Sequence, residues 1–191
     1  MAALDKLAAS RLCNACGLCC NGVMFHKVQL QPRDVAQDLV ALGLRIKRKK
    51  GQEYFMQPCP AYEHSACSIY PSRPERCRLF QCQQLRRMLA GEICEGDALE
   101  KIRGVQRRLG QIEDLLSRAG TTDKRRPLSL RCEKILAEPS FEPAMTEIHR
   151  QLAREIESLD AVLDAEFRVV SESSGSEAPS KQVGDAARLP P

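Results

Sequence analysis

The segment CNACGLCC at residues 13–20 constrains this chain more than any other feature of its sequence. Cys13 and Cys16 have the Cys-x2-Cys spacing that can direct two sulfurs at one metal ion, and Cys16 and Cys19 repeat it. Cys20 follows Cys19 directly, so the two side chains point in different directions and cannot easily serve the same ion. The segment therefore predicts metal binding, with ligands that belong to more than one set of coordination positions.

The composition favours a fold that depends on its cysteines. Aromatic residues make up only 4% of the 191 residues and Trp is absent, whereas cysteine occurs 10 times. A chain with so few large core residues gains stability from disulfides or from metal. Residues 1–12 lack the pattern of a secretory signal, and no apolar run has the length of a membrane span. We therefore expect a cytoplasmic protein, not associated with a membrane, whose reduced thiols bind metal.

A second group of four cysteines lies in the proline-rich segment 57–82, which cannot form long regular structure. The predicted metal ligands are Cys13, Cys16, Cys19, Cys20, Cys59, Cys67, Cys77 and Cys82. Eight thiolates could form two zinc sites of four sulfurs, one four-iron cluster with thiols to spare, or a two-zinc cluster with bridging sulfur. We favour ligands drawn from both sequence groups over two local sites. His64 is an alternative ligand, and Cys94 and Cys132 are expected to be ordinary reduced cysteines.

Hydrophobic periodicity predicts the remaining elements. We expect a helix over residues 1–12, a strand over 23–30, a helix from Pro32 to Gly43, a hairpin over 44–56 and a helix over 83–90. Two helical seams follow, one at Ile102, Val105, Leu109, Ile112, Leu116 and Ala119, and one at Met145, Ile148, Leu152, Ile156, Leu159 and Leu163. An irregular loop joins them.

The predicted fold class is mainly α with small irregular β content. A metal-nucleated, cysteine-rich domain at residues 1–96 precedes an antiparallel helical hairpin at 97–170. Residues 171–191, rich in Ser, Gly, Pro and Ala, are expected to be a disordered tail. The two seams favour a scaffold over a dimerising coiled coil, although the hairpin could present a surface to a protein partner.

Basic residues cluster at 45–50, and the whole chain has a formal net charge of +4. A run of this kind can bind nucleic acid, but no aromatic platform flanks it. We favour a solvated strand edge that lysines protect from aggregation, so nucleic acid is not a favoured partner. The arginines around Cys77 are expected to lower its pKa and favour the thiolate.

The cysteine pattern resembles the YkgJ-type cysteine-cluster family. The resemblance covers residues 13–82 and rests on CNACGLCC, VQLQPRDVAQDLVALG and PCPAY…CSIYPSRPERCRLFQC. It implies a zinc- or iron-chelating domain in which the eight predicted ligands bind the metal. One relative with such a domain is a flagellin lysine N-methylase.

The function that follows is a metal-binding module, with zinc or an iron–sulfur cluster as cofactor, in a structural or interaction role. The alternative is an iron–sulfur enzyme or electron-transfer protein. The sequence assigns no catalytic residue, because no phosphate loop, Gly-rich dinucleotide fingerprint or Ser/His/Asp arrangement stands in a recognisable context. The sequence therefore does not decide whether the protein is an enzyme.

Overall fold

The computed structural model describes residues 3–169. This part of the chain contains seven α-helices and five short strands, which confirms a mainly α fold with small β content. The helices are α1 Ala3–Cys16, α2 Ala36–Ala41, α3 Glu75–Leu79, α4 Gln83–Leu89, α5 Glu95–Arg118, α6 Leu128–Ala137 and α7 Pro143–Glu166. The strands are β1 Lys27–Gln29, β2 Ile46–Lys49, β3 Gln52–Met56, β4 Tyr62–Glu63 and β5 Ala66–Cys67. The tail predicted at 171–191 lies outside the described residues.

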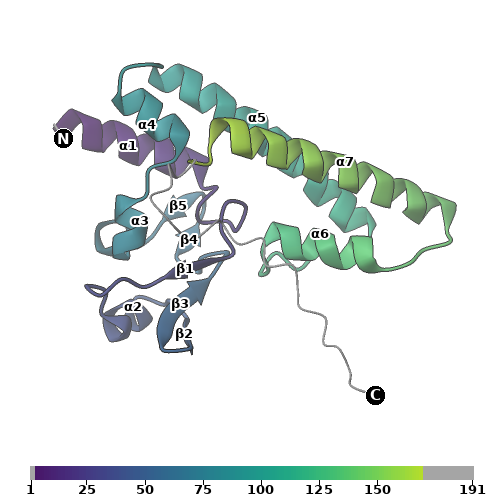
Figure 1. Cartoon of the computed structure of the whole chain (residues 1–191), viewed down its shortest axis with the longest axis horizontal. Helices are drawn as coiled ribbons and strands as arrows, with labels where there is room; N and C mark the ends of the chain where they lie inside the picture. Colours follow the sequence, from purple (N-terminus) through teal and green to yellow (C-terminus); the bar gives the residue numbers. More distant parts are fainter. Residues whose placement is uncertain (1–2, 170–191) are drawn as a thin grey trace.

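The molecule has a helical layer and a smaller sheet lobe (Figure 1). Helices α1, α4, α5, α6 and α7 form the layer, and the strands lie with α2 and α3 on one side of it. Each part has its own apolar interior. We call them the helical core, which includes Ile102 and Leu152, and the sheet core, which includes Phe55 and Leu39.

Helices α5 and α7 form the long antiparallel pair that the two seams predict. Arg108 on α5 pairs with Glu155 on α7 at 2.9 Å, and Lys101, nearer the start of α5, pairs with Glu166 at the end of α7. The seam residues Ile102, Val105, Ile112 and Leu116 of α5 are buried with Ile148, Leu152, Leu159 and Leu163 of α7. Apolar residues at three- and four-residue steps therefore locate this interface correctly.

The expected irregular loop between the two seams contains a helix, α6. Pro127 precedes it, and Leu128, Cys132 and Ile135 face the helical core. Arg131 is also buried, and its guanidinium donates two hydrogen bonds of 2.7 Å to the Glu113 carboxylate on α5. The pair places a charged residue on the apolar face of a short helix, which obscures the periodicity in the sequence.

Two other predicted elements are shorter than expected. The strand expected at 23–30 is regular only at 27–29, and the helix expected from Pro32 begins at Ala36. The Asp34 carboxylate accepts hydrogen bonds from the backbone N–H groups of Gln31 and Glu75, both at 2.8 Å. This carboxylate stabilises a turn before α2, in which the Asp34 N–H also donates to the Gln31 carbonyl oxygen at 2.9 Å, and it satisfies an N–H at the start of α3.

The sheet has the strand order β1-β3-β2, with both pairings antiparallel. Val28 lies opposite Phe55 and Ile46 opposite the same residue on the other side, so one central aromatic residue anchors the three strands. The basic residues of β2 are exposed, as expected for a solvated edge strand. The second sheet is the two-stranded β4–β5 hairpin.

The helical core extends across residue 96, the boundary proposed from the sequence. Leu12 of α1 and Leu85 of α4 belong to the same buried cluster as Ile102 of α5. The division into domains at 1–96 and 97–170 stays a prediction about folding units. No helix among residues 3–169 is both long and apolar enough to cross a membrane.

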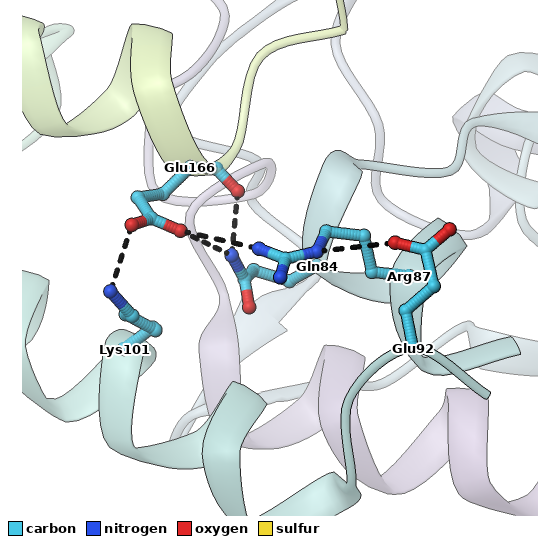
Figure 2. A network of polar contacts seen from close by, with 5 residues as sticks. All are labelled: Gln84, Arg87, Glu92, Lys101 and Glu166. Atoms are coloured by element: carbon cyan, nitrogen blue, oxygen red, sulfur yellow. Dashed lines mark hydrogen bonds and ion pairs between the residues drawn. The ribbon is translucent and has the colours of Figure 1, made fainter. Parts of the chain in front are cut away.

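Glu166 joins three elements of the helical layer (Figure 2). Its carboxylate accepts hydrogen bonds from Lys101 at 2.8 Å and from the Gln84 amide at 3.1 Å, and Arg87 lies 3.7 Å away. Arg87 also contacts Glu92 at 3.4 Å. The hydrogen bond from Lys101 is the main reason that the pKa of Glu166 lies below its ordinary value.

We expect Glu166→Gln to lower the free energy of unfolding at pH 7 by about 1 kcal/mol, because partly exposed charged hydrogen bonds contribute modestly. Glu92→Gln is the matched control and should change it by less than about 0.5 kcal/mol. A lowered folded-state pKa stabilises the fold above the ordinary carboxylate pKa of about 4.3, and the effect disappears as the pH falls through the lowered value. Urea unfolding across this range should show wild type and Glu166→Gln converging in acid.

Candidate metal centre

The eight predicted ligands lie on the helical layer, on the sheet lobe and on the segments that connect them. Cys13 and Cys16 lie in the last turn of α1, Cys19 and Cys20 in the turn that follows, and Cys82 at the start of α4. The sheet lobe contributes Cys59 before β4, Cys67 on β5 and Cys77 on α3. All eight are free thiols and all are partly buried.

The first group is a helix end followed by a compact turn. Cys13 and Cys16 are one helical turn apart, so their side chains share one face of α1. Gly17 has φ +66°, in the left-handed region, and ends the helix. Its carbonyl then accepts hydrogen bonds from the N–H groups of Cys20 and Asn21, at 2.8 and 2.9 Å. The helix that the sequence predicts over 1–12 therefore continues into the cysteine segment and carries its first pair.

Tyr62 of β4 packs directly against Gly17. A methyl group added at Gly17 would collide with the phenol ring and its hydroxyl. Burial raises the pKa of Tyr62, and the neighbouring thiols of Cys20 and Cys16 act in the same direction. Sequence reasoning missed this residue, because nothing in the spacing of Tyr62 relates it to a turn forty residues earlier.

Burial dominates the chemistry of the thiols. It is the first cause that raises the pKa of Cys16, Cys20 and Cys77, each to about 12, and it raises the pKa of Cys19 well above its ordinary value. A thiol with so high a pKa is protonated at neutral pH. A metal ion that binds here must displace those protons and supply the charge that stabilises the thiolates.

The expectation that arginines lower the pKa of Cys77 is wrong in its net result. Arg73 does lower it, but burial and the thiols of Cys59 and Cys67 outweigh this effect. Arg76 and Arg78, also expected to act on this thiol, are exposed on α3. A count of nearby cations in the sequence could not show this, because it contains no information on burial.

Arg73 nevertheless has a defined place near the thiols. Its Nε donates a hydrogen bond of 3.0 Å to the Tyr70 carbonyl oxygen, and its guanidinium lies 3.6 Å from the centre of the Tyr70 ring. It lowers the pKa of Cys13 on α1 as well as that of Cys77 on α3. One fixed cation therefore acts on cysteines of both sequence groups.

Two histidines and two cysteines outside the predicted set are exposed, buried in the helical core or hydrogen-bonded to other groups. His64 is exposed in the turn between β4 and β5, and His26 shares a hydrogen bond of 2.5 Å with the Ser129 hydroxyl on α6. Cys94 is exposed and accepts a hydrogen bond from the Asp97 N–H, as the first residue of a capping box on α5. Cys132 is buried in the helical core.

The donor chemistry fits zinc or iron, because free, partly buried thiols are the ligands that both metals use in proteins. The side chains as they stand do not form a coordination sphere. Among residues 3–169, no three or more His, Cys, Asp or Glu side chains are arranged so that they could hold a metal ion. The cysteines would therefore draw closer together on binding.

Residues 12–95 match the protein family CxxCxxCC, whose description is "Putative zinc- or iron-chelating domain". The match confirms the resemblance that the cysteine pattern indicates. It contains all eight predicted ligands and Cys94, and it ends at the start of α5. The comparison with curated proteins finds no match, and the comparison with solved structures finds none.

We expect Gly17→Ala to lower the free energy of unfolding more than Gly43→Ala does. Both glycines have positive φ, so each alanine costs about 1 kcal/mol of backbone strain. Nothing lies near Gly43, whereas the methyl group at position 17 must displace Tyr62, at a further cost of about 1–3 kcal/mol. Denaturant unfolding of both variants measures the difference, and equal losses would contradict the contact.

Proposed function

We propose that this protein binds zinc or iron through the eight cysteines of its CxxCxxCC domain, and that the metal has a structural role. The observation that carries the proposal is that six of the thiols pack on two separate apolar cores, three on each. Cys13, Cys16 and Cys82 pack against the helical core, whereas Cys59, Cys67 and Cys77 pack against the sheet core. Metal–thiolate bonds would join the two parts.

The size of the sheet lobe supports this role. Its core consists of six buried residues: Val28, Leu39, Leu44, Phe55, Ala61 and Ile69. Three of the cysteines pack directly on this small cluster. A core of this size gives little stability by itself, and small domains of this kind use metal or disulfides instead. All the cysteines are free here, which favours metal and a reducing compartment such as the cytoplasm.

The chain's own residues prepare the thiols in two ways. Backbone N–H groups of Gln84 and Leu85 oppose the effect of burial on the pKa of Cys82, and those of Ala61 and Tyr62 do the same for Cys59. N–H groups directed at a sulfur stabilise the thiolate that a metal requires. Arg73 supplies positive charge near Cys13 and Cys77. A bound metal would add the cross-link that holds the helical layer and the sheet lobe in place.

An interaction role for the α5–α7 pair and an iron–sulfur enzyme both remain hypotheses from the sequence. The identity of the metal separates the structural proposal from the iron–sulfur alternative. Protein purified without oxygen should be colourless and contain zinc, or iron without sulfide, if the structural proposal holds. Brown protein with acid-labile sulfide would support the alternative.

We expect Cys16→Ser to lose metal and thermal stability, because it removes a ligand at the end of α1. Cys94→Ser is the matched control, since serine is an effective N-cap and that thiol lies outside the predicted set. Elemental analysis of anaerobically purified protein, with thermal unfolding, tests both variants. Wild-type protein that is free of metal yet folds cooperatively would contradict the proposal.

We expect Arg73→Met to weaken zinc binding about 10–100-fold, the usual cost of removing a group that orients or balances metal ligands. Methionine keeps much of the apolar stem but removes the charge near Cys13 and Cys77. Arg76→Met, on the exposed side of α3, should leave the affinity unchanged. Competition with a chromophoric zinc chelator measures both, and equal affinities would show that Arg73 does not support the site.

A further inference from the structure

The packing of the cysteines divides them differently from their order in the sequence. Cys82 belongs to the second sequence group, yet it packs against the helical core together with Cys13 and Cys16. Helix α4, which Cys82 begins, lies against α1 and α5 in the helical layer (Figure 1). The other three members of the second group pack against the sheet core. Three cysteines therefore lie on each side.

The adjacent pair Cys19–Cys20 supplies one further cysteine to each side. The carbonyl oxygen of Cys20 accepts a hydrogen bond of 2.8 Å from the backbone N–H of Cys59, which fixes Cys20 beside the sheet lobe. Neighbouring side chains along a chain point in different directions, so Cys19 is directed away from the position that Cys20 takes. With Cys20 held beside the sheet lobe, Cys19 is the member of the pair that is available to the helix side.

We infer that the chain has two four-sulfur metal sites that cross its two sequence groups. A helix-side set consists of Cys13, Cys16, Cys19 and Cys82, and a sheet-side set of Cys20, Cys59, Cys67 and Cys77. The inference rests on the proposed function and specifies how its ligands are shared. Each set would hold one zinc or ferrous ion in the tetrahedral coordination that four thiolates provide.

Tyr62 lies next to the turn that carries the adjacent pair. Its phenol ring packs on Gly17, which ends α1 and precedes the turn that contains Cys19 and Cys20. Because β4 belongs to the sheet lobe, this contact places the end of α1 against the sheet side.

Paired substitutions in the full chain, loaded with zinc under anaerobic conditions, distinguish the crossed sets from local ones. Wild type should hold about two zinc ions per chain. Cys19→Ser/Cys82→Ser removes two ligands from one crossed set and should leave about one ion. Cys77→Ser/Cys82→Ser removes one ligand from each crossed set and should leave none. Local sites, with Cys13 to Cys20 in one and Cys59 to Cys82 in the other, predict the reverse.

Alkylation of the wild-type chain provides a second test that does not depend on variants that fold. Zinc is withdrawn stepwise with a chelator, exposed thiols are alkylated, and the modified cysteines are identified by peptide mass. We expect the cysteines to become reactive in two groups of four, one of which contains Cys82 together with Cys13. Reactivity of Cys82 together with Cys59 and Cys77 would overturn the crossed assignment.

The outcomes separate this inference from the proposed function. Wild type without any bound metal contradicts the proposed function itself. Wild type that holds a single ion, or that loses all its metal in one step with all eight thiols exposed together, retains the proposed function but overturns the two sites. Iron with acid-labile sulfide overturns them as well, because inorganic sulfide belongs to an iron–sulfur cluster and not to separately bound single ions.

Discussion

The packing of partly buried cysteine thiols on two apolar cores, three thiols on each, is the constraint on which the rest of this structure depends. A buried thiol favours its protonated form, and the pKa values of Cys16, Cys20 and Cys77 are accordingly raised to about 12. Free thiols in this state contribute little more than small apolar side chains. Thiolates bound to metal would instead link α1, α4, α3 and the β4–β5 hairpin. The cysteines would therefore stabilise the fold mainly when metal is bound.

The two cores differ in how much they need such a link. The helical core extends over five helices, and buried residues along α5 and α7 give it a continuous interface. The sheet core has a single large aromatic residue, Phe55, and part of its boundary is formed by cysteines. We therefore expect the sheet lobe to be the part whose structure responds most to the metal, whereas the helical layer forms the platform to which it is attached.

The sequence predicted those features that depend on near neighbours along the chain. The seams of α5 and α7 follow from three- and four-residue spacing, and the β2–β3 hairpin from alternation around Lys50 and Gly51. It did not predict α6, because the buried pair Arg131–Glu113 places charge where periodicity requires an apolar residue. Nor did it predict the turn before α2, since the carboxylate of Asp34 has a partner at Glu75, forty-one residues away.

The sequence by itself determined the inventory of this protein: eight cysteines in a pattern that matches the CxxCxxCC family model, two amphipathic helices and few large core residues. Only the tertiary structure decided which apolar core each thiol packs against. Spacing along the chain specifies contacts within a turn or a helix, but Cys82 shares the helical core with Cys13 because α4 packs on α1. Similarly, Cys20 lies beside Cys59 because a backbone hydrogen bond joins their segments. Contacts of this kind depend on how the elements pack, which no local pattern encodes.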